Sequence, residues 1–251
     1  MMEVVVLTAS TGAFPGLVEA LRAIPVLVEE HPLVTFAPPA DWEPLDSALD
    51  RWNSFAAVAF TSPRAATAVR ERLAGRRSRD QNIPVVWAGG AATKDALGEA
   101  LPQVLTPDEA DADRLGVGEA LARAMLDAGV GGPVLFPCGD SRRDELPERL
   151  RGGGVKVEEV VCYRSVLASE SVAHAAAARG TMLVVASPTV ANLLVRACPL
   201  DSRPDLVAVG PTTAASARAS GWLPAAVASS PSTGALAAAV KDLLARRVIH
   251  E

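Results

Sequence analysis

The chain has 251 residues and a net charge of −5, from 24 basic and 29 acidic side chains. This length suits one or two domains with a sizeable core. The acidic balance argues against nucleic acid as the main partner. No apolar stretch approaches the ~18 residues of a membrane span, and the start lacks a signal-peptide pattern. We therefore expect a cytoplasmic protein without a membrane partner. Aromatic residues make up 4%, with a single tyrosine, Tyr163.

The cysteines and histidines do not form a recognisable pattern. Cys138, Cys162 and Cys198 are odd in number and have no C-x-x-C spacing, and the three histidines are scattered. This usage is typical of a reducing compartment, and it predicts neither a disulfide framework nor a metal site.

Short apolar runs alternate with helical patterns along the whole chain. The expected strands are 3–8, 26–28, 56–60, 85–88, 134–136, 155–161, 182–186, 206–209 and 225–228. The expected helices are 14–23, 63–73, 92–101, 115–126, 143–151, 171–179, 189–197, 212–220 and 233–246, and the acidic segment 108–113 is expected as a solvated loop. Continuous apolar strands that alternate with helices predict parallel sheets buried on both faces.

An internal repeat is visible in the turns. Residues 60–65 (FTSPRA) resemble 185–190 (VASPTV), and 90–93 (GAAT) resemble 210–213 (GPTT). At about the same interval, 113–115 (DRL) corresponds to 234–236 (GAL), and each is expected to open an amphipathic helix. Repeated order at one offset predicts two similar α/β domains.

The second copy lacks an opening strand near 168–180, and the strand–helix–strand pattern of residues 1–30 has no obvious partner. The simplest assembly joins 1–35 with 167–251 and inserts 36–166 as the second domain. Linker strands are expected at 34–39 and 161–168, and Pro38-Pro39 favours an extended connection. The predicted fold class is α/β, with two similar flavodoxin-like parallel-sheet domains joined by a two-stranded linker. The first domain is discontinuous.

Four predicted strand ends share one chemistry. Thr61-Ser62-Pro63, Ala186-Ser187-Pro188, Gly210-Pro211-Thr212-Thr213 and Gly139-Asp140-Ser141 each lie between an apolar run and a helix. A Ser-Pro step at a helix start is most often only a cap. Open α/β sheets nevertheless bind ligands at the carboxyl ends of their strands, and helix N-termini attract anions. Four such turns predict an anionic ligand in a cleft between the domains.

The order of several short segments in this chain resembles that of the uroporphyrinogen-III synthase family over nearly the full length. The matching segments are 60–65, 88–93, 144–150 with Gly154 and Val157, 161–166 (VCYRSV), 185–189, 209–214 (VGPTTA) and Gly221. The resemblance implies the two-domain HemD-like version of the fold and an enzyme without a cofactor. It also implies a monomer that makes transient contact with hydroxymethylbilane synthase.

The family acts in haem and cobalamin biosynthesis on hydroxymethylbilane, a linear tetrapyrrole with eight carboxylates. It closes this substrate with inversion of ring D through a spiro intermediate, as a lyase. Tyr163 matches the family's linker tyrosine and could donate a proton to the leaving hydroxyl, because a phenol with a pKa near 10 stays protonated at neutral pH. The alternative for Tyr163 is a buried ring with a hydrogen-bonded hydroxyl. The alternative function is a non-catalytic, two-lobed binding module for an anionic tetrapyrrole or another polycarboxylate.

The same resemblance and the strand-end turns predict the substrate contacts. These are Thr61, Ser62, Arg64, Thr93, Gly139, Arg142, Ser187, Pro188, Thr189, Gly210, Thr212 and Thr213. The chain departs from the family pattern where Thr8 is followed by Ala9-Ser10 in place of Arg-Pro, and where Cys138 replaces a basic residue. Both departures concern turns expected near the ligand.

Overall fold

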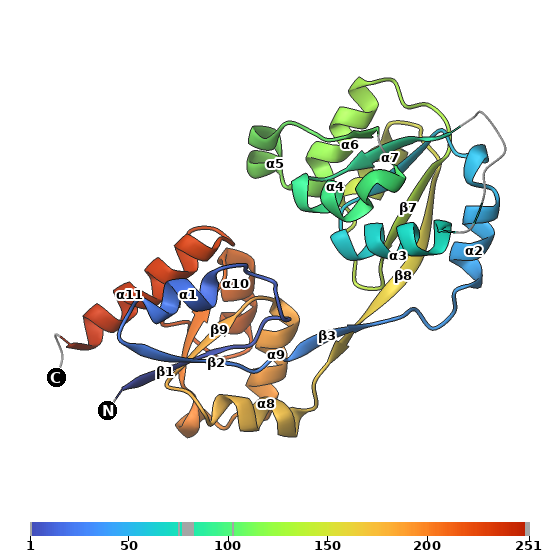
Figure 1. Cartoon of the computed structure of the whole chain (residues 1–251). Coiled ribbons are helices and arrows are strands. Elements are labelled where there is room, and N and C mark those ends of the chain that lie inside the picture. Colours follow the sequence, from blue (N-terminus) through green and yellow to red (C-terminus); the bar gives the residue numbers. More distant parts are fainter. Residues whose placement is uncertain (1, 75, 77–82, 102, 249–251) are drawn as a thin grey trace. The chain divides into compact units, whose positions relative to one another are not determined.

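The structure is a computed structural model that describes residues 2–74, 76, 83–101 and 103–248 (Figure 1). The chain divides into two compact units. Unit 1 combines residues 1–35 with 166–251, and unit 2 comprises residues 36–165. None of the described helices is both long and apolar enough to cross a membrane.

Unit 1 is a five-stranded sheet with helices on both faces. Its strand order is β11-β10-β9-β1-β2, and neighbouring strands run parallel. The strands are β1 (Glu3–Leu7), β2 (Val26–Glu30), β9 (Met182–Val185), β10 (Asp205–Ala208) and β11 (Ala226–Val227). The helices are α1 (Leu17–Arg22), α8 (Glu170–Ala177), α9 (Pro188–Ala197), α10 (Pro211–Ala219) and α11 (Thr233–Val248), with a 3₁₀ turn at Leu200–Ser202.

Alternation along the strands divides the core of unit 1 into two layers. Val6 and Leu183 pack with residues of α8, α9 and α10, whereas Val5 and Met182 pack with residues of α1 and α11. Successive strand residues point to opposite faces, so strands that are covered on both sides must be apolar throughout.

Unit 2 contains a six-stranded sheet of order β3-β8-β7-β4-β5-β6. The strands are β3 (Val34–Ala37), β4 (Ala57–Phe60), β5 (Val85–Ala88), β6 (Val104–Leu105), β7 (Val134–Gly139) and β8 (Val157–Leu167). The helices are α2 (Glu43–Asp50), α3 (Pro63–Leu73), α4 (Ala91–Leu97), α5 (Glu109–Leu115), α6 (Val117–Asp127) and α7 (Glu145–Gly152), with 3₁₀ turns at Trp52–Ser54 and Gly98–Ala100. Residues of α2, α3 and α4 pack in one core layer, and residues of α6 and α7 pack in the other.

The strand orders explain the internal repeat. In chain order within unit 1, the sheet reads 2-1-3-4-5, the flavodoxin-like order. Unit 2 has the same order if β7 and β8 are counted first, ahead of β4, β5 and β6. The strand–helix–strand of residues 3–30 therefore has a counterpart in β7-α7-β8, near the end of unit 2. This pair does not share the offset of the other repeated turns, because it stands first in unit 1 and last in unit 2.

Each sheet changes its winding direction at one point. In unit 1 this switch point lies between β1 and β9, and in unit 2 between β7 and β4. Ligands of open α/β sheets bind outside the carboxyl ends of the strands at such a point. A ligand is therefore expected at the turns after β4 and β7 in unit 2, or after β1 and β9 in unit 1.

Several local expectations need correction. The acidic segment 108–113 is not a loop, because residues 109–115 form α5, with the side chain of Asp108 accepting from the amide of Ala110. Carboxylates in the first turn of a helix interact favourably with the positive end of the helix dipole, so this acidic segment can be helical. Residues 113–115 end that helix rather than opening one. The helix expected at 14–23 begins only at Leu17.

Candidate active site

A pocket of about 400 Å³ lies at the switch point of unit 2. The carboxyl ends of β4 and β7 contribute Thr61, Ser62 and Gly139, and the adjacent β8 contributes Tyr163. Arg142, from the loop after β7, completes the set of predicted site residues that line this pocket. Five of the residues singled out from the sequence are thus brought together at one end of one sheet.

The ring of Tyr163 lies directly over Gly139. The register between β7 and β8 shifts at this point, so that Cys138 pairs with Val161 but Gly139 pairs with Tyr163. A bulge of this kind redirects the side chains beside it. A Cβ atom built on Gly139 would lie 2.6 Å from two ring carbons of Tyr163 and 2.8 Å from its hydroxyl oxygen. Glycine is therefore required here by the close approach of the tyrosine ring.

Hydrogen bonds from the loop after β7 fix the backbone around Tyr163. The amide of Asp140 donates to the carbonyl of Tyr163 at 3.1 Å, and the amide of Ser165 donates to the Asp140 carboxylate at 2.9 Å. Burial raises the pKa of the Tyr163 phenol above its ordinary value, although interactions with Ser62 and Arg64 partly oppose this. The phenol therefore remains a proton donor throughout the neutral range.

Ser62 and Ser187 occupy equivalent helix starts but use their hydroxyls differently. The Ser187 hydroxyl accepts from the amide of Val190 at 3.2 Å and caps α9. The side chain of Ser62 makes no such bond to α3 and interacts instead with the phenol of Tyr163. The expectation that both serines cap their helices is therefore right for Ser187 and wrong for Ser62.

This difference predicts unequal stability losses on removal of the two hydroxyls. Ser187→Ala is expected to lower the free energy of unfolding by about 1 kcal/mol, the usual contribution of an N-cap. Ser62→Ala, its matched control, should cost less because no helix amide loses a partner. Urea denaturation followed by circular dichroism measures both. Equal losses would contradict the assignment of the cap to Ser187 alone.

Arg64 stands in the first turn of α3 with its guanidinium stacked on an aromatic ring. Its Cζ atom lies 3.6 Å from the centroid of the Phe36 ring. Partial burial lowers the pKa of this guanidinium from its high ordinary value, while the interaction with Tyr163 opposes this. Arginine side chains in proteins are effectively always protonated, so the group carries a positive charge. Among the described residues, no carboxylate forms an ion pair with Arg64. Its charge is therefore available to a ligand.

Arg142, by contrast, is already paired. Its guanidinium forms ion pairs with Glu159 and Asp144, and these raise the pKa of Arg142. The neighbouring Arg143 lines the same pocket with its side chain 85% exposed, and its nearest carboxylate, Glu145, is 4.0 Å away. Sequence reasoning missed Arg143, although it directly follows Arg142 in the same turn.

Three helix N-termini border the pocket. Ser62 precedes α3, Gly116 to Gly118 begin α6, and Glu145 with Leu146 begins α7. None of these three helices has a side-chain cap. The first backbone N–H groups of a helix lack partners within the helix and carry the positive end of its dipole. The pocket is thus bordered by neutral donors suited to carboxylates, with Glu119 and Glu145 as opposing charges.

The other predicted contacts lie elsewhere. Thr93 and Thr213 are buried in the first turns of α4 and α10, at 5% and 3% exposure, and their side chains face the interior. Ser187, Pro188 and Thr189 follow β9 at the switch point of unit 1, while Gly210 and Thr212 follow β10. Of these, Thr189 and Thr212 are exposed.

The two departures from the family pattern have structural roles. The Thr8 hydroxyl is fully buried and donates to the carbonyl of Val184 at 2.8 Å, so it ties β1 to β9. Cys138 lies within β7 rather than in a loop, and burial raises the pKa of its thiol to about 11. Its side chain packs in the core.

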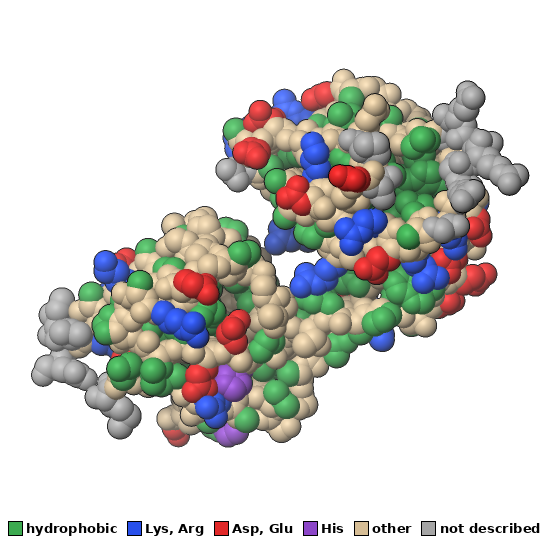
Figure 2. Space-filling model, in the orientation of Figure 1, with side chains coloured by type: hydrophobic (Ala, Val, Ile, Leu, Met, Phe, Trp, Pro, Cys, Tyr) green, Lys and Arg blue, Asp and Glu red, His purple; other side chains and the backbone are tan. Residues whose placement is uncertain are grey.

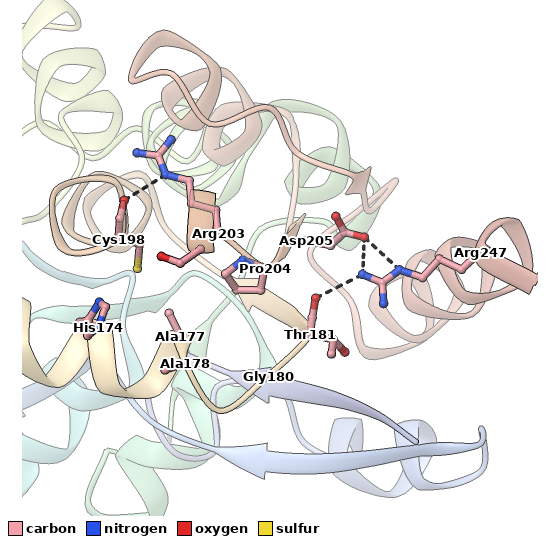
Figure 3. Close-up of a pocket in the computed structure, with 11 residues that line it drawn as sticks. His174, Ala177, Ala178, Gly180, Thr181, Cys198, Arg203, Pro204, Asp205 and Arg247 are labelled. Carbon is pink, nitrogen blue, oxygen red and sulfur yellow. Dashed lines mark hydrogen bonds and ion pairs between the residues drawn. The ribbon is translucent and has the colours of Figure 1, made fainter. Parts of the chain in front are cut away.

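A second cavity, of about 570 Å³, lies at the amino ends of β9 and β10 in unit 1 (Figure 3). Arg247 pairs there with Asp205 at 2.6 Å and with Glu3 at 2.7 Å. Arg203 donates to the carbonyls of Cys198 and Val195, both at 3.1 Å. These arginines hold α11 and the end of α9 in place. The cavity contains none of the predicted site residues, and its arginine charges serve internal bonds.

Basic and acidic side chains are interspersed on the visible face of each unit (Figure 2). Within the described ranges, no cluster of three or more histidine, cysteine or acidic side chains is arranged to hold a metal ion. On the face shown, a site for an anionic ligand would therefore depend on local groups rather than on a broad surface of one charge.

Comparison with known proteins identifies the family. The model of the uroporphyrinogen-III synthase HemD family matches residues 16–238. The crystal structure of uroporphyrinogen-III synthetase from Helicobacter pylori has a TM-score of 0.63 at 18% identity, covering 97% of this chain and 100% of that one. A mutant uroporphyrinogen III synthase from the extremely thermophilic bacterium Thermus thermophilus has a TM-score of 0.62 at 16% identity, with coverage of 97% and 99%. At these identities, the structures establish the fold. The chain belongs, through the match to its family model, to the uroporphyrinogen-III synthases, which are enzymes of tetrapyrrole biosynthesis.

Proposed function

We propose that this chain is a uroporphyrinogen-III synthase that acts as a lyase, with Tyr163 as its general acid. It cyclises hydroxymethylbilane with inversion of ring D. The observation that carries the proposal is the pocket at the switch point of unit 2, where Tyr163, Ser62 and Gly139 converge. Family membership supplies the reaction, and the pocket supplies a proton donor placed among carboxylate-binding groups.

The first chemical step is loss of the terminal hydroxyl of the substrate. The phenol of Tyr163 donates its proton to this hydroxyl, which leaves as water. The electron pair of the pyrrole nitrogen then forms an azafulvene in its cationic form, which keeps the N–H proton. Burial keeps the phenol protonated, and the nearby charge of Arg64 stabilises the phenolate that results. Ser62 interacts with the same oxygen and helps to orient it.

The later steps form and break carbon–carbon bonds. Ring D attacks the azafulvene through its substituted carbon and gives a spiro intermediate, which fragments and recloses with the ring inverted. The proton that is finally lost from the ring carbon returns to the phenolate of Tyr163. Overall, one substrate molecule gives one macrocycle and one water. None of these steps changes an oxidation state. Because the azafulvene also closes without an enzyme to the uninverted isomer, the protein must favour one near-attack geometry.

Substrate binding relies on carboxylate contacts. In unit 2 we assign them to the uncapped N-termini of α3, α6 and α7, to Arg64 and to Arg143. The contacts expected in unit 1, such as Thr189 and Thr212, stay predictions of the sequence. Backbone amides therefore provide much of the affinity, and single hydroxyl losses have mild effects. A single chain carries every group invoked here, and we propose that the monomer is active.

The decisive experiment is the isomer ratio of the product. Purified protein is given hydroxymethylbilane, made in place by hydroxymethylbilane synthase, and the oxidised porphyrins are separated by chromatography. Mainly isomer III is expected, against isomer I in a reaction without the protein. Isomer I alone, together with saturable binding of the tetrapyrrole, would instead identify a non-catalytic binding module.

A further inference from the structure

Phe36 contacts two residues of the candidate site at once. It lies in β3, and its ring is half-buried. The Arg64 guanidinium stacks over it with the Cζ atom 3.6 Å from the ring centroid. The ring of Tyr163 meets it edge to face, with centroids 5.7 Å apart and planes at 75°. One aromatic side chain thus touches both the candidate acid and the unpaired cation beside it.

Both contacts of Phe36 restrict the side chains that make them. A guanidinium within about 6 Å of an aromatic centroid is attracted by the ring face, and more strongly when it is partly desolvated. Arg64 has no ion-pair partner among the described residues, and the stacking on Phe36 is the contact that holds its guanidinium near Tyr163. An edge-to-face pair similarly restricts how a ring can turn. Gly139 lies against the ring of Tyr163 as well, which leaves that ring little freedom.

We propose that Phe36 is a positioning residue of the active site, which holds the guanidinium of Arg64 beside the phenol of Tyr163. A substrate carboxylate bound by Arg64 would then lie next to the proton donor. The catalytic meaning of this arrangement rests on the proposed function. The positioning itself can be tested without substrate.

The single tyrosine of the chain makes that test direct. Ionisation of Tyr163 is the only tyrosine signal in the ultraviolet absorbance of the protein, so its pKa can be read by titration. In the wild-type background, Arg64→Gln is expected to raise the pKa of Tyr163, because a positive charge near the phenolate is lost. In a Phe36→Leu background, the same change is expected to have little effect, because Arg64 is no longer held there.

Activity provides the second readout. Phe36→Leu is expected to lower kcat/KM about fivefold to tenfold, mostly through kcat, as expected for loss of one cation–π contact. Phe36→Trp, which retains an aromatic face for Arg64, should recover most of this loss. Phe55→Leu is a matched control, since Arg51 lies over the Phe55 ring at 5.5 Å, whereas the aromatic contact of Tyr163 is with Phe36 and the charge acting on its phenol is that of Arg64. It should leave the pKa of Tyr163 unchanged.

The outcomes separate this proposal from the proposed function. Equal effects of Arg64→Gln on the pKa of Tyr163 in both backgrounds would overturn the role of Phe36, as would no effect in either. If Phe36→Leu does not fold, a pKa in Phe36→Trp that still responds to Arg64→Gln supports the proposal, and a pKa that does not respond overturns it. If the coupling is present but isomer III is not formed, the positioning stands and the proposed function fails.

Discussion

Tyr163→Phe is expected to lower kcat about 100-fold while leaving the product mainly isomer III. Positioned general acids typically contribute factors of ~10² to 10⁴, and the lower end suits a substrate that also loses its hydroxyl unaided. The phenylalanine ring can fill the space over Gly139, so the geometry that selects the inverted ring should persist. Rates and isomer ratios with hydroxymethylbilane measure the two effects separately.

The pH dependence of the wild-type enzyme gives an independent check. Burial raises the pKa of Tyr163 above its ordinary value near 10. The phenol is therefore fully protonated at lower pH and loses its proton only above that value. The wild type should therefore show no loss of kcat from this group between neutral pH and about pH 9. If Tyr163→Phe has an unchanged kcat, Tyr163 does not donate the proton and is only a contact of the substrate.

Gly139→Ala should have a comparable effect for a steric reason. The added methyl group would lie 2.6 Å from two ring carbons of Tyr163, far inside van der Waals contact. Either the ring moves or β7 and β8 separate, and overpacking of this kind costs about 1–3 kcal/mol. Displacement of a catalytic group by about 1 Å can cost ~10²-fold in rate. We expect a loss of kcat of about that size, with a modest drop in the unfolding midpoint.

Gly152→Ala is the matched control for this substitution. Gly152 ends α7 in the same unit, and no atom lies within 4 Å of its built Cβ position. Neither glycine has a positive φ angle, so a difference between the two alanine variants would not come from backbone strain. Gly152→Ala should retain full activity and stability. If Gly139→Ala is equally silent, the ring of Tyr163 does not lie where the structure places it.

The double variant Gly139→Ala with Tyr163→Phe tests whether both losses share one cause. If alanine acts by displacing the phenol, its effect on kcat should shrink once the hydroxyl is absent. Residues that act through the same group are not additive. Fully multiplicative losses would mean that Gly139 shapes the pocket through some other contact.

Patterns in the sequence were sufficient for the architecture because buried parallel strands leave a clear signature. The apolar runs that became β4 and β9, each followed by Ser-Pro, predicted both the strands and the helices after them. The weak elements were missed: β6 has only two residues, and α2 is short, begins with Glu43-Pro44 and is half polar. The acidic segment that forms α5 was misjudged because its charges suggested a loop, whereas at a helix start they are favourable.

The site was predictable as a set of turns, but the partners of each side chain were not. Ser62 and Ser187 share the Ser-Pro step at a helix start, and this step does not show whether the hydroxyl caps the helix or meets Tyr163 from the neighbouring strand. Arg142 carries the charge expected of a ligand contact, yet Glu159 from β8 already neutralises it. Phe36 was not singled out, because its role depends on Arg64 and Tyr163, which are distant in sequence.

The discontinuity of unit 1 has a consequence for how the chain is made. Strand β1 pairs with β9, and the Thr8 hydroxyl bonds a carbonyl 176 positions later, so the first strand waits for most of the protein to be synthesised. Unit 2, by contrast, is contiguous and is complete once residue 165 has left the ribosome. Contacts between distant segments form slowly, and domains fold as units during synthesis. The inserted unit should therefore be native before the unit that encloses it. Strand β1 can pair early with β2, but its edge toward β9 stays open in the nascent chain and is the place most exposed to misfolding.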